Sequence, residues 1–170
     1  VRSYKDLPLR LSEIGRLHRN ELSGTLGGLL RVRQITMDDA HIYCRPDQIQ
    51  GEVKSILNLV KKFYGLFGFK MSYQLSTKPE KALGDAKIWG KAETALAMAL
   101  KSERLKFTNK PKEGAFYGPK IDIELKDSQG RNWQVATIQL DLVMLPKQFD
   151  VSYIDEKGKE QKPVVIHRAI

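Results

Sequence analysis

The stretch that decides the fold is KIDIELKDSQGRNWQVATIQLD, residues 120–141. In its first seven residues, isoleucine or leucine at 121, 123 and 125 alternates with polar side chains. This period of two predicts a strand with one apolar face. The polar turn at 127–130 then predicts a hairpin with a second strand over residues 133–141. The stretch therefore indicates an antiparallel sheet.

Two longer segments have the spacing of amphipathic helices. The first, residues 47–67, begins with a capping aspartate, Asp47. The second, residues 85–105, carries a stripe of Ile, Ala and Leu. The remaining pattern predicts further strands, which are residues 29–35 and 40–44 as an antiparallel pair, residues 71–76, and a second hairpin made of residues 152–155 and 163–167. The predicted fold class is α+β, an antiparallel sheet flanked by helices.

Composition limits what kind of protein this is. The 170 residues are 41% hydrophobic and 29% charged, which is typical of one globular domain. No apolar run approaches the roughly 20 residues of a membrane span, and no signal peptide is visible. The single cysteine, Cys44, suits a reducing compartment. The net charge of +9 favours a polyanionic partner such as RNA, the alternative being a basic solubilising surface.

Three arginines bracket a segment of small residues near the start of the chain. Arg19 precedes residues 23–28, and Arg31 and Arg33 follow them. Guanidinium groups meet phosphate oxygens in pairs, and glycines let backbone approach a ligand closely. The spacing allows either a clamp for a triphosphate or an ordinary hairpin with solvated arginines.

A second group of polar residues has the chemistry of metal ligands. Asp39 and His41 are two apart, so they share a face on a strand, and His167 ends a predicted strand far along the chain. Two histidines hold Zn²⁺ only with a further protein ligand. Cys44 has the opposite parity to His41, so we interpret it as a buried small hydrophobe. The spacing alone does not decide between a metal site and a structural pair.

Six stretches together resemble the catalytic core of the threonyl-tRNA synthetase family of class II aminoacyl-tRNA synthetases. They are HRNE at 18–21, RVR at 31–33, DDAH at 38–41, EGAFYGPK at 113–120, WQVATIQLD at 133–141 and IHRAI at 166–170. The resemblance implies the α+β fold of a class II catalytic domain. It also implies that residues 1–170 are a partial aminoacylation domain, with motif 1 upstream and motif 3 downstream of it.

The resemblance implies an ATP site and a first set of roles. Arg19 holds the α-phosphate and the amino-acid carboxylate, Glu21 lies by the adenine, and Arg31 meets the γ-phosphate. Gln134 also binds the nucleotide, and Arg19 and Lys120 are the expected catalytic residues. Mg²⁺ accompanies the ATP.

The family also implies a threonine site around zinc. His41 and His167 match two zinc ligands, and the third, a cysteine, belongs to a segment upstream of this chain. Asp39 matches the acceptor of the threonine hydroxyl, and Tyr117 and Gln139 match residues at the amino acid. Three departures suggest a divergent member: Met37 for a frequent glutamine, Val135-Ala136 for a frequent Cys-Gly pair, and one extra residue in the run at 142–146.

The implied function is ATP-dependent activation of threonine and its transfer to tRNA(Thr) by a homodimeric parent enzyme, in the cytoplasm or the mitochondrial matrix. The isolated segment is expected to be inactive. A second hypothesis is a non-catalytic synthetase-like RNA-binding or regulatory module. A zinc hydrolase is disfavoured because no His-Glu-x-x-His motif is present.

Overall fold

The computed structural model describes residues 2–170 and contains one large sheet and one small sheet. The seven-stranded sheet has the order β2-β3-β10-β7-β6-β4-β5, and its neighbours pair antiparallel except for β4 and β5. Its strands are β2 (Leu9–His18), β3 (Gln34–Cys44), β4 (Met71–Ser76), β5 (Phe107–Lys110), β6 (Lys120–Lys126), β7 (Asn132–Asp141) and β10 (Val164–Ala169). The small sheet joins β1 (Arg2–Ser3), β8 (Tyr153–Ile154) and β9 (Glu160–Gln161).

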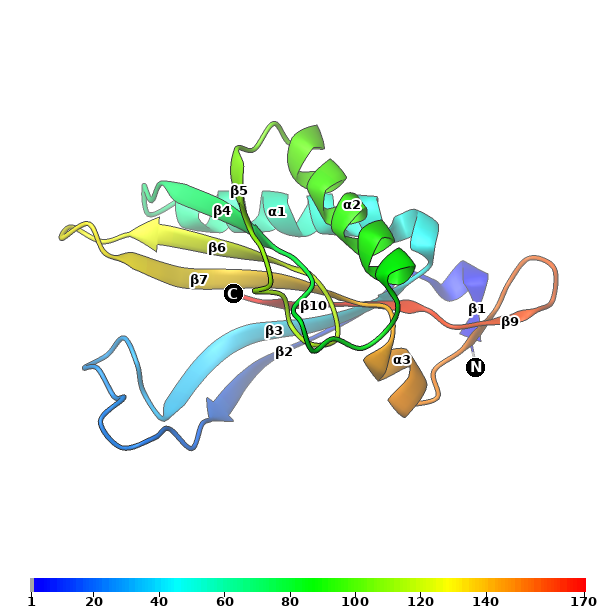
Figure 1. The fold of residues 1–170 in the computed structure, drawn as a ribbon, viewed down its shortest axis with the longest axis horizontal. Coiled ribbons are helices and arrows are strands. Elements are labelled where there is room, and N and C mark those ends of the chain that lie inside the picture. The colour runs from blue at the N-terminus through cyan, green and yellow to red at the C-terminus, as the bar shows by residue number, and fades with distance from the viewer. Residues whose placement is uncertain (1) are drawn as a thin grey trace.

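Two helices, α1 (Ile49–Gly65) and α2 (Ala86–Ser102), cover one side of the large sheet (Figure 1). A short helix, α3 (Met144–Gln148), follows β7, and the 3₁₀ turns η1 (Tyr4–Asp6) and η2 (Pro46–Gln48) precede β2 and α1. Among residues 2–170, no helix is long and apolar enough to cross a bilayer.

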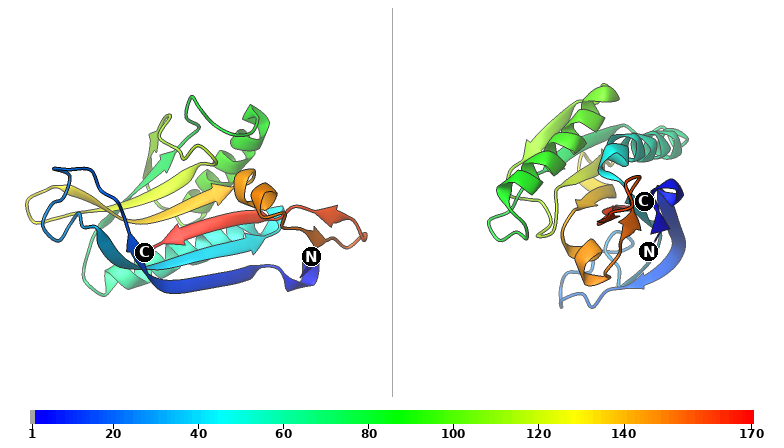
Figure 2. Two further views of the ribbon diagram at one scale, coloured as in Figure 1. Left: turned by 90° about the horizontal axis from the view of Figure 1, so that it is seen from below. Right: turned by 90° about the vertical axis from the view of Figure 1, so that its right-hand side faces the viewer.

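The core lies between this helix pair and the sheet. Helix α1 buries residues at helical spacing, including Val53 and Leu57, and packs over β7 and β10. Helix α2 packs over β4 and β6, and Ile121 and Ile123 of β6 are fully buried in the same core. Because side chains alternate along a strand, the intervening polar residues of β6 lie on the opposite side of the sheet. The long helices α1 and α2 do not cover that side, on which the short helix α3 lies near one end (Figure 2), and it is where a binding site has room.

The fold class and most local predictions are confirmed. Both helices form, and Asp85 caps α2 by accepting a hydrogen bond from the Ile88 N–H at 2.8 Å. The hairpin of residues 120–141 forms as β6 and β7. These elements were predictable because each is specified by its own short stretch of sequence.

Two predicted strand pairings are wrong. Residues 29–33 lie in the loop between β2 and β3, where Gly28 has a positive φ of 55° and Gly27 bridges Arg31. The partner of β3 is instead β2, an edge strand on which Leu11 and Ile14 are 54% and 80% exposed. Because apolar side chains of β2 lie in water, its sequence does not alternate regularly between apolar and polar residues, and the strand was not predicted.

The second wrong pairing concerns the C-terminal hairpin. Residues 153–154 pair with β9, not with residues 163–167. Strand β10 instead lies between β3 and β7 in the large sheet. Val164, Val165 and Ile166 are all at most 2% exposed, and such a continuous buried run is typical of a central strand with both faces covered.

Candidate active-site cleft

A cleft of about 640 Å³ opens on the side of the sheet opposite α1 and α2. Its walls come from β2, β3, β7, β10 and the loop of residues 19–33. Seven of the residues singled out in the sequence line it, namely Arg19, Glu21, Arg31, Asp39, Gln134, Gln139 and His167. His41, Tyr117 and Lys120 are not in its lining and reach it only through neighbours.

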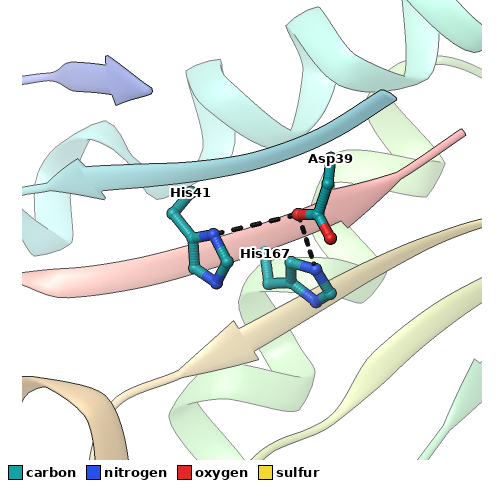
Figure 3. Close-up of side chains that lie close together, drawn as sticks. All are labelled: Asp39, His41 and His167. Atoms are coloured by element: carbon teal, nitrogen blue, oxygen red, sulfur yellow. Dashed lines mark hydrogen bonds and ion pairs between the residues drawn. The ribbon is translucent and has the colours of Figure 1, made fainter. Parts of the chain in front are cut away.

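The histidine end of the cleft, made of Asp39, His41 and His167, is built by strand register. His167 of β10 lies directly opposite His41 of β3, and Asp39 is two residues before His41 on the same side. The His167 Nε2 atom lies 2.9 Å from Asp39 Oδ1, and His41 Nδ1 lies 3.8 Å from the same oxygen (Figure 3). The two imidazoles stack with their centroids 4.7 Å apart. The predicted proximity of these residues is confirmed.

The chemistry of this end suits a divalent metal ion. One ligand atom from each of its three residues lies within 4.8 Å of the others. Burial lowers the pKa of His41, and the neighbouring His167 lowers it further, while Asp39 raises it. His41 is therefore neutral at pH 7, which is the form of imidazole that binds metals.

The arginine end of the cleft, made of Arg19, Glu21 and Arg31, lies in the loop of residues 19–33. The Arg19 N–H donates to the Arg33 carbonyl at 2.8 Å, which closes the base of the loop. The Arg31 guanidinium donates to Glu21 Oε2 from Nη2 at 3.0 Å and from Nε at 3.3 Å. Two residues expected at opposite ends of a nucleotide thus bind each other in this structure.

Beside the cleft, residues 117–120 pack against β7. A Cβ atom on Gly118 would lie 1.8 Å from the Leu140 carbonyl oxygen, so only glycine allows this contact. The contact sets the Tyr117 hydroxyl to donate to Gln139 Oε1. Burial raises the pKa of Tyr117, and Asp141 raises it further, so the phenol keeps its proton as a donor.

Gln134 reaches the cleft through an irregularity in β7. Thr137 and Gln139 face the cleft, and strict alternation would turn Gln134 to the other side. The register with β6 shifts so that Val135 is an extra residue between the pairs Glu124–Gln134 and Ile123–Ala136. Such a bulge re-aims the side chains that precede it. Gln134 therefore faces the cleft, as expected.

Sequence reasoning missed Asp122, a buried carboxylate that contacts Lys120 at 2.7 Å. The signal was available, since the alternation that puts Lys120 on the polar face of β6 puts Asp122 there too. Asp141 has a structural role, and the interpretation of Cys44 as a buried small residue holds in the structure. Asp141 accepts from the backbone N–H groups of residues 143, 144 and 145 at 2.7–2.8 Å, and burial raises the pKa of the Cys44 thiol to about 12.

Comparisons with known proteins identify the family of this chain. The family model described as the tRNA synthetase class II core domain (G, H, P, S and T) matches residues 1–170. The chain is 55% identical over 171 residues to the threonine–tRNA ligase of Fusobacterium nucleatum, covering 100% of this chain and 27% of that protein. It therefore spans about a quarter of the length of this curated relative.

Solved structures give the same picture. The chain is 48% identical to the RNA binding domain of threonyl-tRNA synthetase from Cryptosporidium parvum Iowa II, with a TM-score of 0.93, covering 99% of this chain and 42% of that one. A putative threonyl-tRNA synthetase from Aeropyrum pernix is 31% identical, with a TM-score of 0.81, over 96% of this chain and 39% of that one. These similarities confirm the resemblance seen in the sequence: the chain belongs to the family of the tRNA synthetase class II core domain (G, H, P, S and T).

Proposed function

We propose that the full-length protein activates threonine with ATP and transfers it to tRNA(Thr). One observation carries the proposal: a single cleft has an arginine end suited to phosphates and a histidine end suited to a small amino acid held through a metal. The similarity to threonine–tRNA ligases along the whole chain supports the choice of amino acid.

At the arginine end, Arg19 binds the α-phosphate and the threonine carboxylate. Attack of that carboxylate on the α-phosphorus forms the adenylate and releases pyrophosphate. Negative charge grows on the phosphate oxygens, and the guanidinium that binds them stabilises it. Lys120 is the second cation of this step, Arg31 exchanges Glu21 for the γ-phosphate, and Glu21 lies by the adenine. Mg²⁺ bound with ATP supplies further positive charge to the phosphates.

At the histidine end, the residues present fit Zn²⁺, because two imidazoles that can ligate it lie together beside a carboxylate. We assign His41 and His167 as protein ligands, with the cysteine of the family pattern as the third. When bound, zinc supplies a Lewis acid to the amino and hydroxyl groups of the substrate. Asp39 accepts a hydrogen bond from the threonine hydroxyl, and Tyr117 and Gln139 hold the amino acid. A site that requires a hydroxyl group rejects valine far better than an apolar pocket does.

The proposed partners are ATP, threonine, tRNA(Thr) and a second copy of the protein, in the cytoplasm. The net charge of +9 supports an RNA partner. A second candidate is a non-catalytic RNA-binding or regulatory module, which the description of the Cryptosporidium parvum structure as an RNA binding domain favours. That module would bind RNA without threonine-dependent chemistry on ATP.

Exchange of pyrophosphate into ATP by the full-length protein separates these functions. We expect exchange that depends on threonine, and we expect Asp39→Ala to lower it by roughly 10- to 150-fold, the value of a buried hydrogen bond to a charged group. ATP affinity should stay unchanged in this variant, because Asp39 contacts the amino acid.

The matched control is Asp38→Ala, one residue away on the other face of β3. Asp38 forms an ion pair with Arg168 at 2.8 Å, and its side chain is 40% exposed. This variant should lose roughly 1–3 kcal/mol of stability, because the buried Arg168 is left without its carboxylate, and it should keep the exchange activity. RNA binding without exchange in the wild type would instead favour the regulatory module.

A further inference from the structure

Asp122 is a buried carboxylate beside the cleft. It is 5% exposed and lies on the polar face of β6. Four donors surround its two oxygens. Ser76 Oγ (3.1 Å) and Lys120 Nζ (2.7 Å) contact Oδ2, while Gln134 Nε2 (3.0 Å) and Thr137 Oγ1 (3.3 Å) contact Oδ1.

This geometry fixes the orientation of the Gln134 amide. A carboxylate only accepts hydrogen bonds, so Gln134 must turn its NH₂ group toward Asp122. Its other atom, Oε1, receives no hydrogen bond from residues 2–170. Since Gln134 lines the cleft, its Oε1 atom is an acceptor available to a ligand there.

The same carboxylate holds Lys120. The two residues are two apart on β6 and share a face, and the Lys120 side chain is only 23% exposed. A mostly buried ammonium is stabilised by an opposite charge beside it, and that contact fixes its position. Asp122 therefore contacts two predicted site residues that come from different strands.

We propose that Asp122 is a positioning residue of this cleft. It fixes Gln134 as the acceptor for a hydroxyl or amino donor of the nucleotide and holds the Lys120 ammonium beside it. The proposal rests on the proposed function in one respect, that the cleft binds ATP. Asp122 itself does not contact the ligand and acts through these two side chains.

The Asp122→Asn variant of the full-length protein tests this. Asparagine keeps the shape but replaces one acceptor oxygen by a donor, and Lys120 competes for the oxygen that remains. Gln134 then turns its own oxygen to the new NH₂ group. We expect the KM for ATP to rise about 10-fold, the value of about one hydrogen bond, with the KM for threonine nearly unchanged. Asp122→Glu keeps both acceptor oxygens and should restore most of the ATP affinity.

Glu124→Gln is the matched control. It makes the same chemical change on the same strand and face, and Glu124 Oε2 has no hydrogen-bond partner among residues 2–170. Its kinetic constants should equal those of the wild type. An equal rise in the KM for ATP in both variants would overturn the proposal, since loss of negative charge alone would explain it.

A double-mutant cycle separates positioning from a structural role. In a Gln134→Met background, Asp122→Asn should raise the KM for ATP by much less than 10-fold, because one of the two side chains through which it acts is gone. If the full 10-fold effect persists there, or if Asp122→Asn lowers only the melting temperature, Asp122 is structural and the proposal fails.

The crystal structure of the Asp122→Asn protein gives a readout that does not depend on catalysis. We expect the Gln134 amide to be flipped, which diffraction at atomic resolution or with neutrons distinguishes, while Glu124→Gln leaves its orientation unchanged. An unflipped Gln134 amide together with an unmoved Lys120 side chain would overturn the positioning role. A wild type without threonine-dependent exchange would overturn the proposed function alone, because direct titration with a non-hydrolysable ATP analogue still reads the nucleotide affinity of every variant.

Discussion

The two ends of the cleft are built in different ways. The histidine end stands on β3 and β10, whose neighbours pair on both sides, and the His167 and Asp39 side chains are 22% and 27% exposed. The arginine end stands on the loop of residues 19–33, where Arg31 is 59% exposed and Leu29 is 94% exposed. Sheet register sets the geometry of the first end before any ligand arrives. The second end depends on a few loop contacts, so its final geometry needs the ligand.

Core substitutions have the largest expected effect on stability. They test whether the sheet under the histidine end is packed more firmly than the loop that carries the arginine end. Leu57 of α1 is fully buried against the sheet. Leu57→Ala should cost about 2–5 kcal/mol of stability, from lost burial and the cavity left behind. Leu29→Ala, in the exposed loop, should change stability by less than about 0.5 kcal/mol. Thermal melts of the full-length variants measure both, and similar losses would show that the loop is packed as firmly as the sheet.

Arg19→Ala should have the next largest effect, and it should fall on the reaction instead of on stability. Loss of a positioned charge that stabilises the transition state typically costs roughly 100- to 1,000-fold in rate. The control is Arg16→Ala, an exposed arginine of β2 that does not line the cleft. Pyrophosphate exchange and a melting curve should separate the two variants. A large stability loss in Arg19→Ala would mean that Arg19 organises the loop and not the phosphate.

The contrast between the two ends also explains what the sequence could predict. Asp39 and His41 were placed on one face because a strand alternates, and the 120–141 hairpin was visible because its turn is local. The position of β10 between β3 and β7 depends on pairings across about 125 residues, as between His41 and His167, which no local pattern specifies. His167 was assigned to the site only through the family resemblance. The functional roles of the site residues stay predictions.

Asp122 and the extra residue in β7 were missed for different reasons. Asp122 lies within the alternating stretch, but a buried acid surrounded by donors looks like a solvated one until its neighbours are known. The bulge at Val135 leaves no clear mark in the sequence, since Val135 and Ala136 also fit a regular strand. Gln134 was correctly assigned to the cleft from the resemblance, while simple alternation from Gln139 would have placed it on the wrong side.

The smallest expected effect concerns the Glu21–Arg31 ion pair, and it asks how loosely the loop is held. Because Arg31 is mostly exposed, the pair should couple by no more than about 1 kcal/mol in a double-mutant cycle on stability. The coupling should also shrink as NaCl is raised, since salt screens exposed charges. Glu21→Gln, Arg31→Gln and the double variant, each melted at low and high salt, provide the measurement. A coupling above about 2 kcal/mol that resists salt would mean that the arginine end is as preorganised as the histidine end. Arg31 could not then exchange Glu21 for a phosphate at small cost, and its role at the γ-phosphate would have to be withdrawn.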